Sequence, residues 1–118
     1  MNKLVLLFLA LFASGAAFAQ TTPTATLSWT APTTYTNGTT IPSTVPITYN
    51  LYQGLTCATV AKVATGITAL TDVVNTGLAL GNTYAFTITA VAGGFESSQS
   101  NCGTKGFYAP NAVVLTVQ

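Results

Sequence analysis

The chain has 118 residues, of which 49% are hydrophobic and 4% are charged, and it contains no histidine and no arginine. Neutralising nucleic-acid phosphates takes several basic residues and recruitment to anionic lipid takes basic clusters, so the composition argues against both kinds of partner. The high and regularly placed apolar content also argues against a disordered chain.

The first element is predicted to be a secretory signal peptide at residues 1–19. Lys3 precedes an apolar run that begins at Leu4, and small residues lead up to Ala19, which is the order of such a peptide. The run is shorter than the roughly 20 residues that a membrane-spanning helix needs. We therefore expect cleavage after Ala19, a single mature domain at residues 20–118, a secreted or periplasmic location and no membrane contact after cleavage; a retained anchor is the alternative.

Short β-strands are predicted along the mature chain, because apolar and polar residues alternate with a period of two. The strands are expected at residues 25–31, 47–52, 58–66, 70–74 and 84–90, with a last strand in two pieces at 96–101 and 112–117. A loop rich in glycine, residues 102–111, separates the two pieces. Several short strands with turns between them predict an all-β, antiparallel β-sandwich.

Two loops carry strong turn signals. Residues 32–46 contain three prolines and the pair Asn37-Gly38, and Gly93-Gly94 ends the strand at 84–90. Asn37-Gly38-Thr39 is also formally a glycosylation sequon. Both stretches are therefore expected to be loops.

The segment Leu78–Val91 resembles the fibronectin type III pattern, in which a leucine and a turn precede a tyrosine and an alternating strand. Leu78 matches the leucine, Gly81 the turn glycine and Tyr84 the tyrosine. The resemblance implies a tyrosine corner, in which the ring packs into the sandwich and the hydroxyl bonds to nearby backbone. Three further segments are similar to the family's strand B with its core tryptophan Trp29, its strand C, and its F–G loop: residues 26–32, 47–54 and 93–101.

The resemblance covers residues 25–101 and implies an immunoglobulin-like fold of the fibronectin type III kind. Two departures from the family pattern stand out. Few residues precede the strand at 25–31, which predicts a short or missing first strand, and residues 102–111 interrupt the last one.

Cys57 and Cys102 are the two cysteines of the chain. In an exported protein an even pair is typical of a disulfide. A bridge across this separation would contribute ~4 kcal/mol in the chain-entropy model. Two free thiols or an intermolecular bridge are the alternatives, and two thiols without a histidine do not make a zinc site.

Catalytic chemistry has little support in the sequence. Asp72 and Glu96 are the two carboxylates, and they fall in different loops of the proposed fold. Acid–base catalysis needs positioned pairs of groups, and the many hydroxyls have no histidine to activate them. We expect no enzyme activity, no cofactor and no metal.

Aromatic residues in loops are the candidate binding residues. Trp29, Tyr49, Tyr84 and Phe86 alternate with polar residues and are expected to fill the core. Outside the strands, the candidates are Tyr35, Asn37, Phe95, Phe107 and Tyr108. In the type III topology the B–C and F–G loops share one end, so Tyr35 and Phe95 are expected to form one patch. The alternatives are that Phe95 folds over the core and that Phe107 and Tyr108 cover an open edge.

Three functions remain open on this reading. The first is a secreted, non-enzymatic module that recognises another protein or a surface glycan through its loops. The second is a structural subunit of an extracellular assembly, such as a filament, a surface layer or a virion appendage, in which an edge left by a missing strand accepts residues 20–25 of another copy. The third is a periplasmic inhibitor or accessory protein. The near-neutral charge also leaves self-association open.

Overall fold

The computed structural model describes residues 21–118, and the predicted signal peptide lies outside these residues. Within the described part of the chain, no helix is long and apolar enough to span a membrane. The strands are β1 (Ala25–Ser28), β2 (Ile47–Gly54), β3 (Ala61–Ile67), β4 (Thr71–Val74), β5 (Asn82–Ala92), β6 (Phe95–Glu96) and β7 (Gly103–Phe107).

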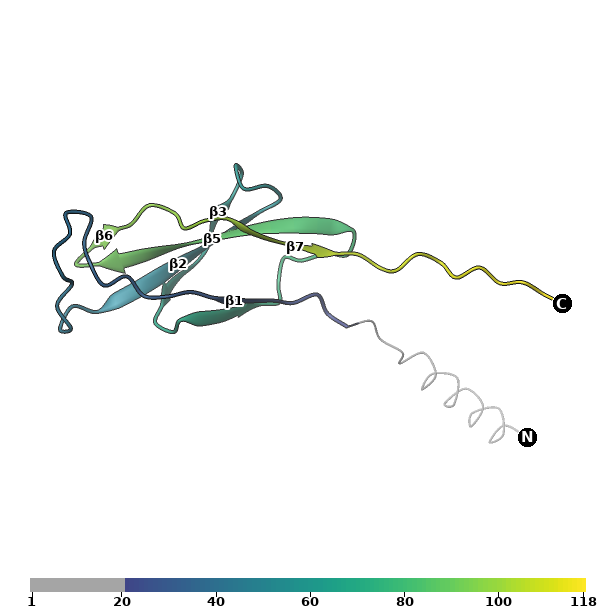
Figure 1. Cartoon of the computed structure of the whole chain (residues 1–118), viewed down its shortest axis with the longest axis horizontal. Helices are drawn as coiled ribbons and strands as arrows, with labels where there is room; N and C mark the ends of the chain where they lie inside the picture. The colour runs from purple at the N-terminus through teal and green to yellow at the C-terminus, as the bar shows by residue number, and fades with distance from the viewer. Residues whose placement is uncertain (1–20) are drawn as a thin grey trace, which may run out of the picture.

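The strands form two antiparallel sheets that face each other (Figure 1). One sheet contains β1 and β4. The other has the order β3-β2-β5, and both β6 and β7 pair with β5 at different places along its length. The all-β, immunoglobulin-like antiparallel sandwich predicted from the sequence is confirmed.

The core lies between the sheets and follows the predicted alternation. Tyr84 and Phe86 of β5 are 8% and 4% exposed, and they pack with Leu51 of β2 and with Ala25 of the facing sheet. Burial of side chains of this size stabilises a fold by about 1.5–3 kcal/mol each. Trp29, also expected in the core, is half-buried.

The tyrosine corner expected at Tyr84 is present. The backbone N–H of Ala79 donates to the Tyr84 hydroxyl at 2.9 Å, and Leu78 packs against the core. Gly81 has a φ of +88°, a left-handed conformation that glycine adopts without strain. Its N–H donates to the Phe107 carbonyl, which ties the turn before β5 to the end of β7.

No strand precedes β1 within residues 21–118, in line with the short or missing first strand expected from the sequence. Residues 21–24 form no strand, and β4 is the one strand that pairs with β1 in the described chain. Within residues 21–118, the other edge of β1 is therefore open.

The predicted arrangement of the last strand is wrong in two places. The expected loop at residues 102–111 contains β7, because residues 103–107 pair in register with residues 82–86 of β5. Conversely, residues 112–117 form no strand and lie exposed. Sequence composition suggested a loop because β7 contains two glycines, but an edge strand tolerates them when its neighbour supplies the ladder.

Serine side chains bridge the gap between β6 and β7. The N–H groups of Ser97 and Ser100 donate to the carbonyls of Ala90 and Ile88, and the hydroxyls of the same serines accept from the N–H groups of Ala90 and Ile88. The hydroxyls thus take the place of backbone acceptors along β5. The predicted strand at 96–101 is a short strand followed by this serine-bonded segment.

Cys57 and Cys102 form an intrachain disulfide, which settles the alternatives that the sequence left open. Cys57 follows β2 and Cys102 precedes β7, two strands that flank β5 on opposite sides. The bridge therefore crosses β5. Ala85 lies between Gly54 and Thr104 in the register and is 0% exposed, as expected for a small residue beneath such a bridge.

Candidate binding cleft

A small hairpin holds Tyr35 in the loop between β1 and β2. Its backbone N–H donates to the Thr39 carbonyl at 2.8 Å, and its carbonyl accepts from the Gly38 N–H at 2.9 Å. Asn37 Oδ1 accepts from both the N–H and the hydroxyl of Thr39. Asn37 therefore stabilises the turn that positions Tyr35, which gives it a local structural role.

A two-residue turn places Phe95 opposite this hairpin. Gly93 and Gly94 both have positive φ, at +59° and +83°, as the type I′ turn between antiparallel strands requires. Phe95 follows directly, pairs with Ala92 and is 83% exposed. The alternative in which Phe95 folds over the core is wrong.

The two aromatic side chains line one cleft of about 330 Å³. The cleft is lined by residues of the loop between β1 and β2, of β5 and of β6. Figure 1 shows this loop and β6 at the same end of the sandwich. Its other walls include Pro32, Ile41 and Glu96. The expectation that Tyr35 and Phe95 share a patch is confirmed, and the patch is mostly apolar. Glu96 borders it, but its carboxylate points to the opposite face of the sheet, toward Asn50 and Thr89.

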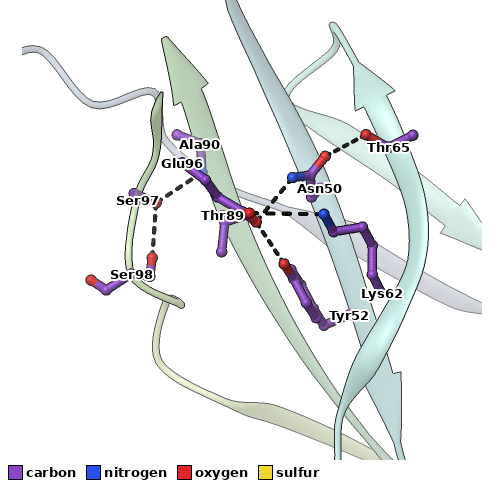
Figure 2. Close-up of polar contacts among 9 residues, drawn as sticks. All are labelled: Asn50, Tyr52, Lys62, Thr65, Thr89, Ala90, Glu96, Ser97 and Ser98. Atoms are coloured by element: carbon purple, nitrogen blue, oxygen red, sulfur yellow. Dashed lines mark hydrogen bonds and ion pairs between the residues drawn. The ribbon is translucent and has the colours of Figure 1, made fainter. Parts of the chain in front are cut away.

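Glu96 is held by polar side chains from the neighbouring strands (Figure 2). Its Oε2 accepts from the Asn50 amide at 2.9 Å, from the Tyr52 hydroxyl at 2.6 Å and from the Thr89 hydroxyl. The Lys62 ammonium lies 3.8 Å from Oε1. One side chain thus joins β2, β3 and β5 to β6 on the outer face of the larger sheet.

These contacts fix the charge of Glu96. Hydrogen bonds from Thr89, Tyr52 and Asn50, in that order, lower the pKa of its carboxyl from 4.5 to about 2, and Lys62 adds a smaller effect. A carboxylate with so low a pKa is a poor general base near neutral pH. It is instead a fixed acceptor, and Oε1 keeps lone pairs for a donor from outside.

Phe107 and Tyr108 do not belong to this cleft. Phe107 is 8% exposed and packs in the core, so the sequence-based assignment of a binding role to it is corrected. Pairing of β7 with β5 turns its side chain inward. Tyr108 is 64% exposed, and its hydroxyl bonds to that of Thr83 near the start of β5. The cleft lies at the other end of that strand, so the structure separates Tyr108 from Tyr35 and Phe95.

The polar cluster around Glu96 is the part of the site that sequence reasoning missed. Asn50 and Thr89 are buried polar residues, and the Thr65 hydroxyl donates to Asn50 Oδ1 at 2.7 Å. The available signal was the run of polar residues at alternate positions of β2 and β5, on the face opposite the core. Glu96 was treated as an isolated carboxylate because the register that unites these strands is not visible in any one of them.

Residues 21–118 hold no group of three cysteine, aspartate or glutamate side chains placed to bind a metal. A comparison of the chain with protein-family models gives no match, and neither does a comparison with curated proteins. Any functional proposal must therefore come from the cleft and the open edge themselves.

Proposed function

We propose that the chain is an exported, non-enzymatic binding module of the fibronectin type III kind, which recognises a protein or a surface glycan through the cleft between Tyr35 and Phe95. The observation that carries this proposal is the pairing of two exposed aromatic rings, each on a hydrogen-bonded turn, across one apolar cleft. The tyrosine corner and the strand order support the family assignment.

The chemistry of the cleft suits recognition. Aromatic rings offer a large contact area at low cost in conformational entropy. The turns at Asn37 and at Gly93-Gly94 fix the backbone that carries the rings, which reduces the ordering cost of association. An oxidising compartment is consistent with the disulfide, which supports export.

The test is a binding screen with matched variants. The protein is applied to an array of surface glycans and, separately, used to capture cell-surface proteins. Phe95→Ala and Tyr35→Ala should each abolish most of the captured signal. Tyr108→Ala removes an exposed aromatic residue far from the cleft and should leave binding unchanged. Equal loss in all three variants, or in none, would contradict a binding role for the cleft.

A second candidate function is a subunit of an extracellular assembly. The specific observation in its favour is the open edge of β1, to which an extended segment of another chain can add. The near-neutral net charge of the chain provides little repulsion between copies. Sedimentation that shows a monomer at every concentration would contradict this function.

A further inference from the structure

The open edge of β1 offers unpaired backbone groups. The Trp29 N–H donates to the Leu70 carbonyl at 3.0 Å, which extends the ladder between β1 and β4. Alternate residues of a strand turn their backbone groups to opposite sides. Thr26 and Ser28 therefore point their N–H and C=O groups away from β4, toward the open edge.

The opposite edge of the same sheet is protected. By the same alternation Val73 points its N–H away from β1, and this N–H donates to Asp72 Oδ1 at 3.0 Å. A charged side chain at that place blocks strand addition. The β1 edge carries a charge at its start, where the Lys105 ammonium meets the Thr24 carbonyl, but no charged side chain lines the groove beside Thr26 and Ser28.

A groove runs beside the open edge. It has a volume of about 630 Å³, and its apolar lining comes from Leu27, Trp29, Phe86 and Ile88. Ser100, Asn101 and Gly103 also line it. An extended segment could use its backbone to pair with the unpaired groups of β1. If every second residue of the segment is apolar, these side chains could enter the space between the sheets.

Such a segment is present at residues 112–117. Val113, Leu115 and Val117 fall at alternate positions and are 92%, 83% and 84% exposed. The segment has neither a charged residue nor a proline and is rich in β-branched residues, which is typical of segments that pair as strands between chains. Figure 1 shows it leading away from the sandwich beyond β7.

We propose that residues 112–117 of one copy add as a strand to the β1 edge of a second copy and place Val113, Leu115 and Val117 in its groove. This proposal rests on the assembly function and names the segment that joins the copies. Residues 20–25, expected to fill this role, are poorly suited, because Pro23 has no N–H to donate and Ala25 already belongs to β1.

The direction of the chain favours a second copy over the same copy. The Lys105 ammonium donates to the Thr24 carbonyl at 3.1 Å, so β7 ends beside the start of β1. If residues 112–117 turned back onto their own β1, they would run parallel to it. A segment from another copy can run antiparallel, which is the more stable pairing. The segment 112–117 and the groove beside β1 are different surfaces, so each copy can donate its segment to one neighbour and accept that of another. Repetition of this contact builds a chain of copies.

Sedimentation velocity from about 10 µM to about 1 mM tests the association. The wild-type protein should show a rising average mass, by at least about twofold at the upper end. Leu115→Asp should remain a monomer. Leu55→Asp, which changes another exposed leucine, should associate like the wild type. A monomeric wild type, or association that survives Leu115→Asp, would overturn the proposal.

A peptide experiment locates the contact. A synthetic peptide of residues 111–118 is added to ¹⁵N-labelled Leu115→Asp protein, whose own segment no longer competes. The amides of Thr26 and Ser28 should shift and become protected from hydrogen exchange. Shifts confined to Tyr35 and Phe95, or no shift, would overturn the proposal.

Thermal unfolding at a concentration where both proteins are monomers tests closure within one copy. If Leu115→Asp melts at a lower temperature than the wild type under these conditions, the segment binds its own copy, and the proposal is overturned as well. None of these results depends on the cleft, so the binding function stands or falls separately.

Discussion

Asn50 and Glu96 are separated by 46 positions in the chain, and a hydrogen bond of 2.9 Å joins their side chains. Asn50 uses both ends of its amide, since its Oδ1 accepts from Thr65 while its Nδ2 donates to the carboxylate. Three donors on one carboxylate oxygen favour the ionised form of Glu96. The carboxylate of Glu96 therefore connects β6 to β2, β3 and β5 through its hydrogen bonds and its ion pair. The same residue also lines the cleft.

Acid should weaken the fold through Glu96. Its carboxyl has a pKa of about 2 in the folded chain against 4.5 without these contacts. A depressed folded-state pKa contributes stability that is fully present above about pH 4.5 and is lost as the pH falls toward 2. The melting temperature of the wild type should fall through this window, and that of Glu96→Gln should fall less. Equal slopes for both proteins would contradict the assignment.

The hydroxyl of Thr89 makes the largest contribution to this low pKa. Thr89→Val should therefore raise the pKa of Glu96, because the ionised form loses a hydrogen-bond donor. Thr87→Val is the matched control, since the Thr87 hydroxyl donates to Gln99 and not to Glu96. An NMR titration of the Glu96 carboxyl carbon in the three proteins measures the change. An equal pKa in the wild type and Thr89→Val would show that this bond does not stabilise the carboxylate.

The sequence was sufficient where the structure is local. Leu78, Gly81 and Tyr84 lie within seven positions, and their pattern specified a turn, a corner and a strand that the structure contains. Tyr35 and Phe95 were placed together because the type III resemblance implied which loops share an end. The edge left by the missing first strand followed from the few residues before β1.

Features that depend on lateral pairing were not predictable in the same way. Phe107 is buried because β7 pairs with β5, and its glycine-rich neighbourhood resembled a loop. Glu96 gains its partners from strands brought together by the register of the larger sheet. The alternation at residues 112–117 indicated a strand, but the sandwich provides no partner for it within the described chain. At these positions the pairing between strands, and not the local sequence preference, decides the structure.

The hydroxyl of Tyr84 should contribute measurably to stability. Tyr84→Phe removes the acceptor of the Ala79 N–H, and because Ala79 is exposed and water can reach this N–H, the cost is that of one net hydrogen bond, about 0.5–1.5 kcal/mol. Tyr49→Phe is the control, because Tyr49 is also a buried tyrosine of the larger sheet but its hydroxyl makes no hydrogen bond within residues 21–118. Urea denaturation of both variants gives the comparison. An equal loss in the two would mean that the corner bond adds nothing.

Removal of the disulfide should destabilise the sandwich strongly. The variant with both Cys57→Ala and Cys102→Ala loses a cross-link over 45 positions, which corresponds to ~4 kcal/mol in the chain-entropy model. Urea denaturation measures the loss, and the wild type unfolded with and without reductant provides the control. If the variant matches the oxidised wild type, the bridge does not constrain the unfolded chain as expected.

Two glycines of β7 should respond differently to alanine. At Gly106 a Cβ would lie 2.6 Å from Cε2 of the Tyr108 ring and 3.1 Å from the Thr83 hydroxyl, so Gly106→Ala must displace the ring and break the bond between those two side chains. The loss of that bond costs about 0.5–1.5 kcal/mol.

At Gly103 no atom lies within 4 Å of the added Cβ and φ is not positive. Gly103→Ala should therefore stabilise the fold by about 0.4–1 kcal/mol, because it reduces the freedom of the unfolded chain. Thermal unfolding of the two variants should shift in opposite directions, and a stabilising Gly106→Ala would show that the Tyr108 ring does not hold its place over β7.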